Sequence, residues 1–293
     1  MTTLKFWGVR GSIPTPGPDT VRYGGNTACI ELRHGNKLVI LDGGSGLRAL
    51  GNELIKSNSS INANIFISHM HWDHIQGIPF FTPAYIPGNH FVLYGAEDSD
   101  KSLADIISGQ MDPTYFPIEL SEMGAKLEFQ RLYEGNYTID GIKIQTIYVN
   151  HPGNALGYKF TFGPNKIVYI SDNEPLPEFS HNESTDQDAD SFIADDGKDK
   201  LIKFIKNASI LIHDAQYTPD EYSKHMTWGH SPYDYTVKLA IEAGVKKLIL
   251  FHHDPLHNDD FIDDMLMNAK KLASELKADI EISAAREGMT VSC

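Results

Sequence analysis

The sequence is poor in cysteine and in basic residues, and it has no long apolar run. Two cysteines, Cys29 and Cys293, are too few for a disulfide framework or a cysteine-rich zinc site, and their number suits a reducing compartment. Lys and Arg total 25 against 39 Asp and Glu, so the net charge of −14 disfavours an extended nucleic acid or an anionic membrane as a partner. No apolar run approaches the roughly 20 residues that a membrane helix needs, so we expect no membrane span. A small ligand or a metal ion suits this composition better.

The amino terminus also lacks the features of a secretory signal. Residues 1–18 contain Arg10 and three prolines, whereas a signal peptide needs an unbroken apolar stretch of about 7–15 residues. We therefore expect a cytoplasmic protein. The 293 residues, of which 41% are hydrophobic, are enough for one large domain or two small ones. Because neither a repeat nor a low-complexity linker divides the chain, we predict a single domain over residues 1–293.

Histidine is abundant, with thirteen residues, and several follow short apolar segments that are predicted to be buried strands. In an open α/β sheet, ligands bind beyond the carboxyl ends of the strands, so a series of such endings predicts one shared site. The predicted strands and the residues that follow them are 38–41 before Asp42, 64–67 before His69, 142–149 before His151, 167–170 before Asp172, 210–212 before His213 and Asp214, and 247–251 before His252.

Two helices are predicted in the second half of the chain. The segment Ser231-Pro232-Tyr233-Asp234 places Ser at the N-cap and Pro at the first helical position, and Gly244 ends the helix. Apolar residues then repeat every three or four positions over residues 262–276, which indicates an amphipathic helix packed on a sheet. Together with β-like alternation in the first half, this pattern predicts two sheets between layers of helices.

Two stretches are predicted to be insertions. Residues 178–199 are rich in Asp and Glu and poor in large apolar groups, so we expect a solvated loop. Residues 109–117 combine a helix stop, two prolines and two aromatic residues, and they are a candidate lid over the site. Packing of this second stretch against the body of the domain is the equally weighted alternative.

The strongest motif follows the predicted strand at 64–67 and has the pattern His-x-His-x-Asp-His. Four residues able to bind metal within six positions are hard to explain by packing. On a tight turn at a strand end, the first two histidines can point to one side, and the Asp and the last His can point to the other. The motif can therefore supply ligands to two adjacent metal sites. The motif residues are His69, His71, Asp73 and His74.

This motif, followed by a lone His, an Asp and a final His, resembles the metallo-β-lactamase-fold hydrolases along nearly the whole chain. The resemblance implies an α/β fold, a four-layered αββα sandwich, with two divalent metal ions bound. Zn²⁺ is expected first, and Mn²⁺ or Fe²⁺ accepts the same ligands. It implies that one metal is held by His69, His71 and His151, the other by Asp73, His74 and His252, with Asp172 as the bridge and Asp42 orienting a ligand. His253 is the neighbouring alternative to His252 as a metal ligand, and Glu174 is the neighbouring alternative to Asp172 as the bridge.

Other segments resemble the phosphodiesterase branch of this family. His213-Asp214-Ala215 and Gly229-His230-Ser231 are similar to the His-Glu-Ala and His-Ser-Thr segments of ribonuclease Z, except that Asp214 is shorter than the Glu of that enzyme. The segments at 6–12 and 23–27 resemble those of cyclic nucleotide and cyclic ribose-phosphate phosphodiesterases. Since some family members form dimers, a homodimer is a candidate assembly.

These residues predict hydrolysis of a phosphodiester by water. A metal pair lowers the pKa of water and clamps the phosphate oxygens during in-line attack. Asp73 would also accept a proton from the attacking water or orient it, and His230, held by Asp214, would protonate the leaving alkoxide. The negative net charge favours a small substrate, and a 3′,5′-cyclic nucleotide is our first candidate.

Several alternatives remain open at this point. The same metal pair could process RNA as ribonuclease Z does, or hydrolyse a thioester or a lactone. A non-hydrolytic metal-binding or cyclic-nucleotide-binding module is the hypothesis from another class. Candidate substrate contacts are Tyr115, Phe116 and Trp228 for stacking on a base, and Arg10, Asn26 and Thr27 for phosphate or sugar.

Overall fold

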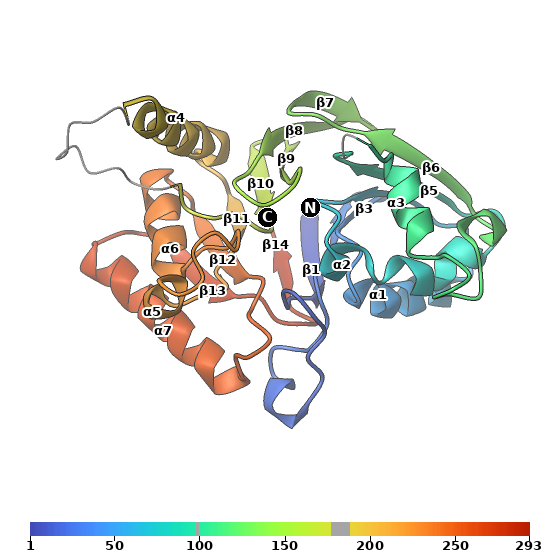
Figure 1. The fold of residues 1–293 in the computed structure, drawn as a ribbon, viewed down its shortest axis with the longest axis horizontal. Helices are drawn as coiled ribbons and strands as arrows, with labels where there is room; N and C mark the ends of the chain where they lie inside the picture. Colours follow the sequence, from blue (N-terminus) through green and yellow to red (C-terminus); the bar gives the residue numbers. More distant parts are fainter. Residues whose placement is uncertain (98–99, 177–187) are drawn as a thin grey trace.

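Two seven-stranded sheets face one another, and helices cover the outer side of each (Figure 1). The computed structural model describes residues 1–97, 100–176 and 188–293. Within these residues, the elements of the first half build one sheet with its helices, and those of the second half build the other, apart from β14, which joins the first sheet. The four-layered αββα sandwich predicted from the sequence is confirmed.

The first sheet is antiparallel at one side and parallel at the other. Strands β3 to β6 run parallel, and the pairs β14–β1, β1–β2 and β2–β3 are antiparallel. In sheet order the strands are β14 (Thr290–Ser292), β1 (Thr2–Gly8), β2 (Cys29–His34), β3 (Lys37–Leu41), β4 (Asn62–Phe66), β5 (His90–Gly95) and β6 (Lys126–Arg131). Its helices are α1 (Gly46–Leu54), α2 (Trp72–Ile75) and α3 (Leu103–Gly109).

The second sheet has the same mixed design. Strands β10 to β13 run parallel, and β7 to β10 are antiparallel neighbours. In sheet order the strands are β13 (Glu281–Ala284), β12 (Lys247–Phe251), β11 (Ile210–Asp214), β10 (Asn165–Ile170), β9 (Leu156–Phe162), β8 (Ile142–Tyr148) and β7 (Gly135–Ile139). Its helices are α4 (Asp188–Ile205), α5 (Pro219–Tyr222), α6 (Tyr233–Glu242) and α7 (Asp259–Glu275).

Short 3₁₀ turns link these elements in the described part of the chain. They are η1 (Pro18–Thr20), η2 (Ile55–Ser57), η3 (Ile78–Phe80), η4 (Thr82–Tyr85) and η5 (Leu120–Glu122). In the same part of the chain, no helix combines the length and the apolar character that crossing a membrane requires.

The strands and helices predicted from the sequence are present. All six predicted strands occur, with bounds that differ by a few residues at most. Helix α7 buries Ile262, Met265 and Ala269, as its apolar period predicts. Helix α6 begins one residue later than predicted, at Tyr233, because the hydroxyl of Ser231 donates to the carbonyl of Asn173 instead of capping the helix.

The structure describes only part of the acidic insertion predicted at 178–199. Its residues 178–187 lie outside the described residues. The prediction of a loop is wrong for 188–199, which belong to α4. This helix continues to Leu201 and Ile205, and their buried side chains pack in the apolar layer beneath α6 and α7. An acidic composition therefore did not prevent a helix, since the anchoring residues follow the acidic run.

The candidate lid at 109–117 packs partly against the body of the domain. Met111 is buried, and the ring of Phe116 contacts that of Phe80 with centroids 5.4 Å apart. Tyr115 is exposed. The structure therefore shows the packing that was the alternative to a lid, and closure of this segment over the site stays a prediction.

The two sheets are held together by an apolar layer between them. Phe66 lies at its centre, fully buried, with its ring against those of Tyr94, Tyr158 and Phe160. Two further apolar layers join each sheet to its own helices. Because the inner layer joins the two halves of the chain, its packing also fixes how the strand ends of the two sheets meet.

Replacing Phe66 by Ala should therefore lower the free energy of unfolding by about 3–5 kcal/mol, the usual cost of removing a buried aromatic ring. Chemical denaturation followed by circular dichroism measures this change. Leu256→Ala is the control, because Leu256 is 91% exposed and its truncation should change the stability by less than about 0.5 kcal/mol. Equal effects of the two substitutions would contradict the role assigned to the inner layer.

Candidate metal centre

The residues predicted to bind metal converge at the carboxyl ends of strands from both sheets. His69, His71, Asp73 and His74 follow β4 of the first sheet. The others follow strands of the second sheet: His151 after β8, Asp172 after β10 and His252 after β12. The structure therefore brings together residues that lie up to 183 positions apart in the sequence, at the edge where the sequence predicts one shared site.

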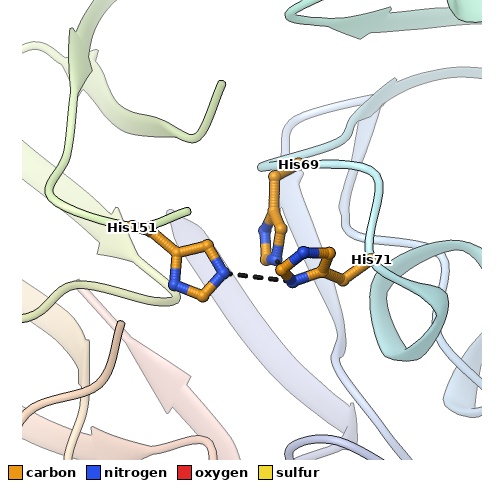
Figure 2. Close-up of side chains that lie close together, drawn as sticks. All are labelled: His69, His71 and His151. Carbon is orange, nitrogen blue, oxygen red and sulfur yellow. Dashed lines mark hydrogen bonds between the residues drawn. The ribbon is translucent and has the colours of Figure 1, made fainter. Parts of the chain in front are cut away.

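A first cluster contains His69, His71 and His151 (Figure 2). His71 Nδ1 lies 2.9 Å from His69 Nε2 and 3.1 Å from His151 Nε2. Burial is the main cause that lowers the pKa of all three imidazoles, so their neutral, metal-binding forms are favoured. His71 is exposed whereas the other two are buried, so the cluster is accessible from the His71 side.

A second cluster contains Asp73, His74, Asp172 and His252, all of them buried. The Nε2 atoms of the two histidines both face Asp73 Oδ2, at 3.1 Å each. Burial disfavours the charged form of Asp73, but the neighbouring His74 and His252 outweigh it and hold the pKa of this carboxyl well below its usual range. The cluster thus offers an ionised carboxylate between two imidazoles.

Asp172 lies between the two clusters and offers one oxygen to each. Its Oδ1 is 3.3 Å from His74 Nε2 and 3.4 Å from His252 Nε2, in the second cluster. Its Oδ2 is 3.6 Å from His69 Nε2 and 3.8 Å from His151 Nε2, in the first. Burial opposes its charge, yet the surrounding histidines keep its pKa well below the usual range. This arrangement is the one that a bridging carboxylate needs.

Asp42 orients the second cluster from behind. Its carboxylate lies 2.8 Å from His74 Nδ1, so it fixes the ring with Nε2 toward the cluster. The same carboxylate accepts hydrogen bonds from the backbone N–H and the hydroxyl of Ser68 and from the hydroxyl of Tyr169. Asp42 adopts a left-handed backbone conformation, with φ +59°, directly after β3. The orienting role expected for Asp42 therefore has a geometric basis.

Two further residues support the centre without a signal in the sequence. Tyr169, within β10, holds Asp42. Gln216, after β11, accepts a hydrogen bond at its Oε1 from His252 Nδ1 over 2.9 Å and so directs His252 Nε2 toward Asp73. Their roles depend on contacts between distant strands, which one sequence does not reveal.

The two neighbouring alternatives, His253 and Glu174, bind backbone groups outside the two clusters. His253 Nε2 donates to the carbonyl of Ala285 at 2.9 Å, and burial lowers the pKa of this imidazole to about 3. Glu174 accepts hydrogen bonds from the backbone N–H groups of Thr227 and Gly229 and does not belong to either cluster. The geometry therefore favours His252 and Asp172 over His253 and Glu174.

The charges of this region fit a pair of divalent cations. Four buried carboxylates surround the centre, from Asp42, Asp73, Asp172 and Asp214, and in the described part of the chain none of them forms an ion pair with Lys or Arg. Buried carboxylates are costly unless positive charge is brought near them. Two dications would balance four carboxylates if the histidines are neutral, and imidazole with carboxylate is a suitable donor set for zinc, manganese or iron.

A buried Asp–His pair lies next to these clusters. Asp214 Oδ2 is 3.2 Å from His230 Nδ1, and the backbone N–H of Ser231 also donates to this carboxylate. The shorter Asp214, in place of Glu, therefore still reaches its partner. Burial disfavours the imidazolium of His230, but the hydrogen bond to Asp214 and the charges of the nearby carboxylates together outweigh burial and raise the pKa of His230. His230 Nδ1 lies 3.8 Å from Asp172 Oδ2, so the pair and the bridging residue form one site.

The candidate substrate contacts of the opening segment are corrected by the structure. Arg10 is fully buried, and its guanidinium donates to the carbonyls of Gly24, Asp254 and His257. Thr27 is fully buried as well. The Asn26 side chain is engaged with Glu287 and Ser45. All three bind the opening segment to the protein instead of facing the centre.

The aromatic candidates lie on the surface. Trp228 is exposed, two positions before His230, with its ring against that of His225. Tyr115 is exposed and Phe116 is partly buried on the first half of the domain. Of the three, Trp228 is next to the centre in the sequence, and a contact with substrate stays a prediction for each.

Comparisons with known proteins identify the family. Residues 38–253 match the beta-lactamase superfamily domain. The chain belongs to the beta-lactamase superfamily. Ribonuclease Z of Picrophilus torridus is 24% identical over 305 aligned positions, which cover 93% of this chain and 91% of that protein. The family resemblance seen in the histidine motif is thereby confirmed.

Solved structures agree with this family. YhfI of Bacillus subtilis, a metallo-β-lactamase fold protein, superposes with a TM-score of 0.68 at 20% identity and covers all of both chains. The short form of human tRNase Z superposes with a TM-score of 0.61 at 18% identity, covering 99% of this chain and 98% of that one. These likenesses establish the fold. Members of this superfamily are metal-dependent hydrolases, and this chain carries a His/Asp set able to hold metal.

The protein should take up two divalent cations per chain, measured by elemental analysis after equilibration with zinc and gel filtration. Asp42→Asn should weaken the binding of zinc about 10–100-fold, because His74 loses the carboxylate that orients it. Competition with a chromogenic chelator measures the affinity. Glu53→Gln, at an exposed pair with Lys56, is the control and should bind as the unaltered protein does. A stoichiometry of one cation per chain or fewer would contradict the two-cation arrangement.

Proposed function

We propose that the protein is a metal-dependent phosphodiesterase that cleaves a small phosphodiester, with a 3′,5′-cyclic nucleotide as the first candidate substrate. The observation that carries the proposal is the Asp214–His230 pair beside the two clusters. A buried imidazole held by a carboxylate is suited to general acid catalysis. Hydrolysis of a phosphodiester needs such an acid because the leaving alkoxide is a strong base.

The metal ligands follow from the two clusters. Bound cations would lower the pKa of water toward neutrality and offset the negative charge of the phosphate. One cation would be held by His69, His71 and His151 and the other by Asp73, His74 and His252, with Asp172 between them. Zinc is the expected metal, and manganese or iron accepts the same ligands.

The protein's own groups would then position the attacking water and protonate the leaving oxygen. The backbone N–H of Ser12 donates to Asp73 Oδ2 at 2.8 Å and fixes this carboxylate, which would orient the attacking water. His230 would stabilise the charge that develops on the phosphate and donate a proton to the leaving oxygen. Asp214 would keep the imidazole in one orientation, and its hydrogen bond to Nδ1 supports this role.

The surroundings support a small substrate. The net charge of −14 repels a long polyanion. A cavity of about 790 Å³ borders His151, and Tyr222, Tyr235 and Met226 are among its lining residues. Its volume is in the range of small-molecule sites. Lysines at its rim are paired with acids, Lys198 with Glu242 and Lys238 with Asp234, which suits a neutral ring better than further phosphates.

Processing of RNA is the second candidate function. Ribonuclease Z of Picrophilus torridus matches 93% of this chain, and the fold is shared with human tRNase Z. The two candidates use the same metal centre and the same acid, so they differ only in what binds around it.

Replacing His230 by Ala should lower kcat for a cyclic nucleotide about 10²–10⁴-fold, the usual contribution of a positioned general acid. The two metal clusters should remain filled, because His230 is not among the proposed ligands. Steady-state kinetics with metal content measured on the same sample tests this expectation. His90→Ala is the control, since His90 pairs with Glu128 at the start of β5, and its activity should match that of the unaltered protein. An unchanged rate in the His230 variant would remove the acid from the mechanism.

A substrate panel separates the candidates. The zinc-loaded protein should give its highest kcat/KM with cyclic mononucleotides or cyclic ribose phosphates, and a chelator should abolish this activity. Higher kcat/KM for a transfer RNA precursor would favour the second candidate. Turnover confined to thioesters or lactones would overturn the phosphodiesterase proposal.

A further inference from the structure

The loop that carries His230 is held by a buried carboxylate outside the metal clusters, that of Glu174. Its Oε1 accepts the backbone N–H of Thr227 at 2.6 Å and the hydroxyl of Tyr222 at 3.1 Å. Its Oε2 accepts the backbone N–H of Gly229 at 2.9 Å. Glu174 thus gathers the turn at 227–229 onto the loop that follows β10.

This turn has a backbone that needs outside support. Thr227 has φ +73°, a conformation that β-branched residues rarely adopt and that persists only where the surroundings fix it. Gly229 has φ +87°, and a Cβ atom there would lie 2.2 Å from His151 Nδ1. The hydrogen bonds from Glu174 act at these two residues.

Gly229 connects the turn to both parts of the proposed mechanism. Its N–H donates to Glu174, and its carbonyl accepts a hydrogen bond from His151 Nδ1 at 2.9 Å, which directs His151 Nε2 toward the first cluster. His230 is the next residue along the chain. A shift of Gly229 would therefore move a metal-binding imidazole and the proposed acid together.

Glu174 is itself anchored beside His151. Its backbone N–H donates to the carbonyl of Asn150 at 2.7 Å, and the side-chain amide of Asn150 donates to the carbonyl of Glu174 at 3.0 Å. The carboxylate is therefore attached to the segment that presents His151 and bound to the turn that presents His230. It also lies two positions after the bridging Asp172.

We propose that Glu174 is a positioning residue that sets the orientation of His151 and the location of His230 by fixing the turn at 227–229. The proposal rests on the phosphodiesterase function proposed above. Glu174 does not touch the reacting atoms. Its effect passes through the peptide of Gly229, so its loss should alter metal affinity and acid catalysis at the same time.

Glu174→Ala and Glu174→Gln test this role with two readouts. The first is the affinity for zinc, which should fall about 10–100-fold in the Ala variant, as expected when support of a ligand is lost. The second is the dependence of the rate on the leaving group. The Ala variant should lose about 100-fold in kcat with a cyclic nucleotide, whose alkoxide needs the acid, and less than about 10-fold with methyl p-nitrophenyl phosphate, whose nitrophenolate leaves without one.

Glu174→Gln should give values of both readouts between those of the Ala variant and the unaltered protein. The amide keeps one acceptor but turns its NH₂ group toward an N–H of the turn. Tyr222→Phe removes only the hydroxyl that binds Glu174 and should change both readouts in the same direction by a smaller factor. This variant keeps the test decisive if the Ala variant does not fold. Glu128→Gln is the matched control, because Glu128 pairs with Lys126 and His90 on the first sheet.

The outcomes are distinct. Unchanged zinc affinity together with an equal loss of rate for both leaving groups would overturn the proposal, as would no loss in either readout. If the unaltered protein cleaves no phosphodiester, the proposed function fails, and the zinc affinities of the Glu174 variants alone still decide whether Glu174 orients His151.

Discussion

The charge balance at the centre is the constraint on which the rest of this structure depends. Four carboxylates lie buried where two sheets meet, and imidazoles contact all four of them. Such a set is unfavourable in an apolar interior unless positive charge is brought to it. Asp172 is the central member, because its two oxygens face different histidine clusters. The fold is therefore organised to bring cations to one place, and those cations would in turn join its two halves.

Much of this centre was predictable, because the sequence places its polar residues directly after apolar strands. Asp42, Asp172 and His252 each follow a segment that is buried on both faces, so their location at a sheet edge follows from the strand alone. The residues of the motif at 69–74 also divide between the two clusters. These strand ends could be predicted from one sequence because the apolar strand and the polar residue after it are neighbours along the chain.

The misjudged residues depend on distant contacts. Arg10 follows the first strand and is a candidate contact to phosphate or sugar in the sequence, but its guanidinium binds carbonyls that include two more than 240 residues away along the chain. Gln216 and Glu174 carry no such signal in the sequence, because each contacts a partner that another strand or loop brings near. An arginine that binds substrate and one that ties two segments together look alike in a sequence, and only the tertiary fold separates them.

Backbone strain at the strand ends shows how the centre is kept in place. Asp42 and His252, on different sheets, both adopt left-handed conformations directly after a parallel strand, with φ near +60°. For residues other than glycine this geometry costs on the order of 1–3 kcal/mol and persists when the surroundings fix it. Asp42 is fixed by Ser68, His74 and Tyr169, and His252 by Gln216. The strain turns each side chain away from the path of its strand and toward the other sheet, so that residues of both sheets meet at one point.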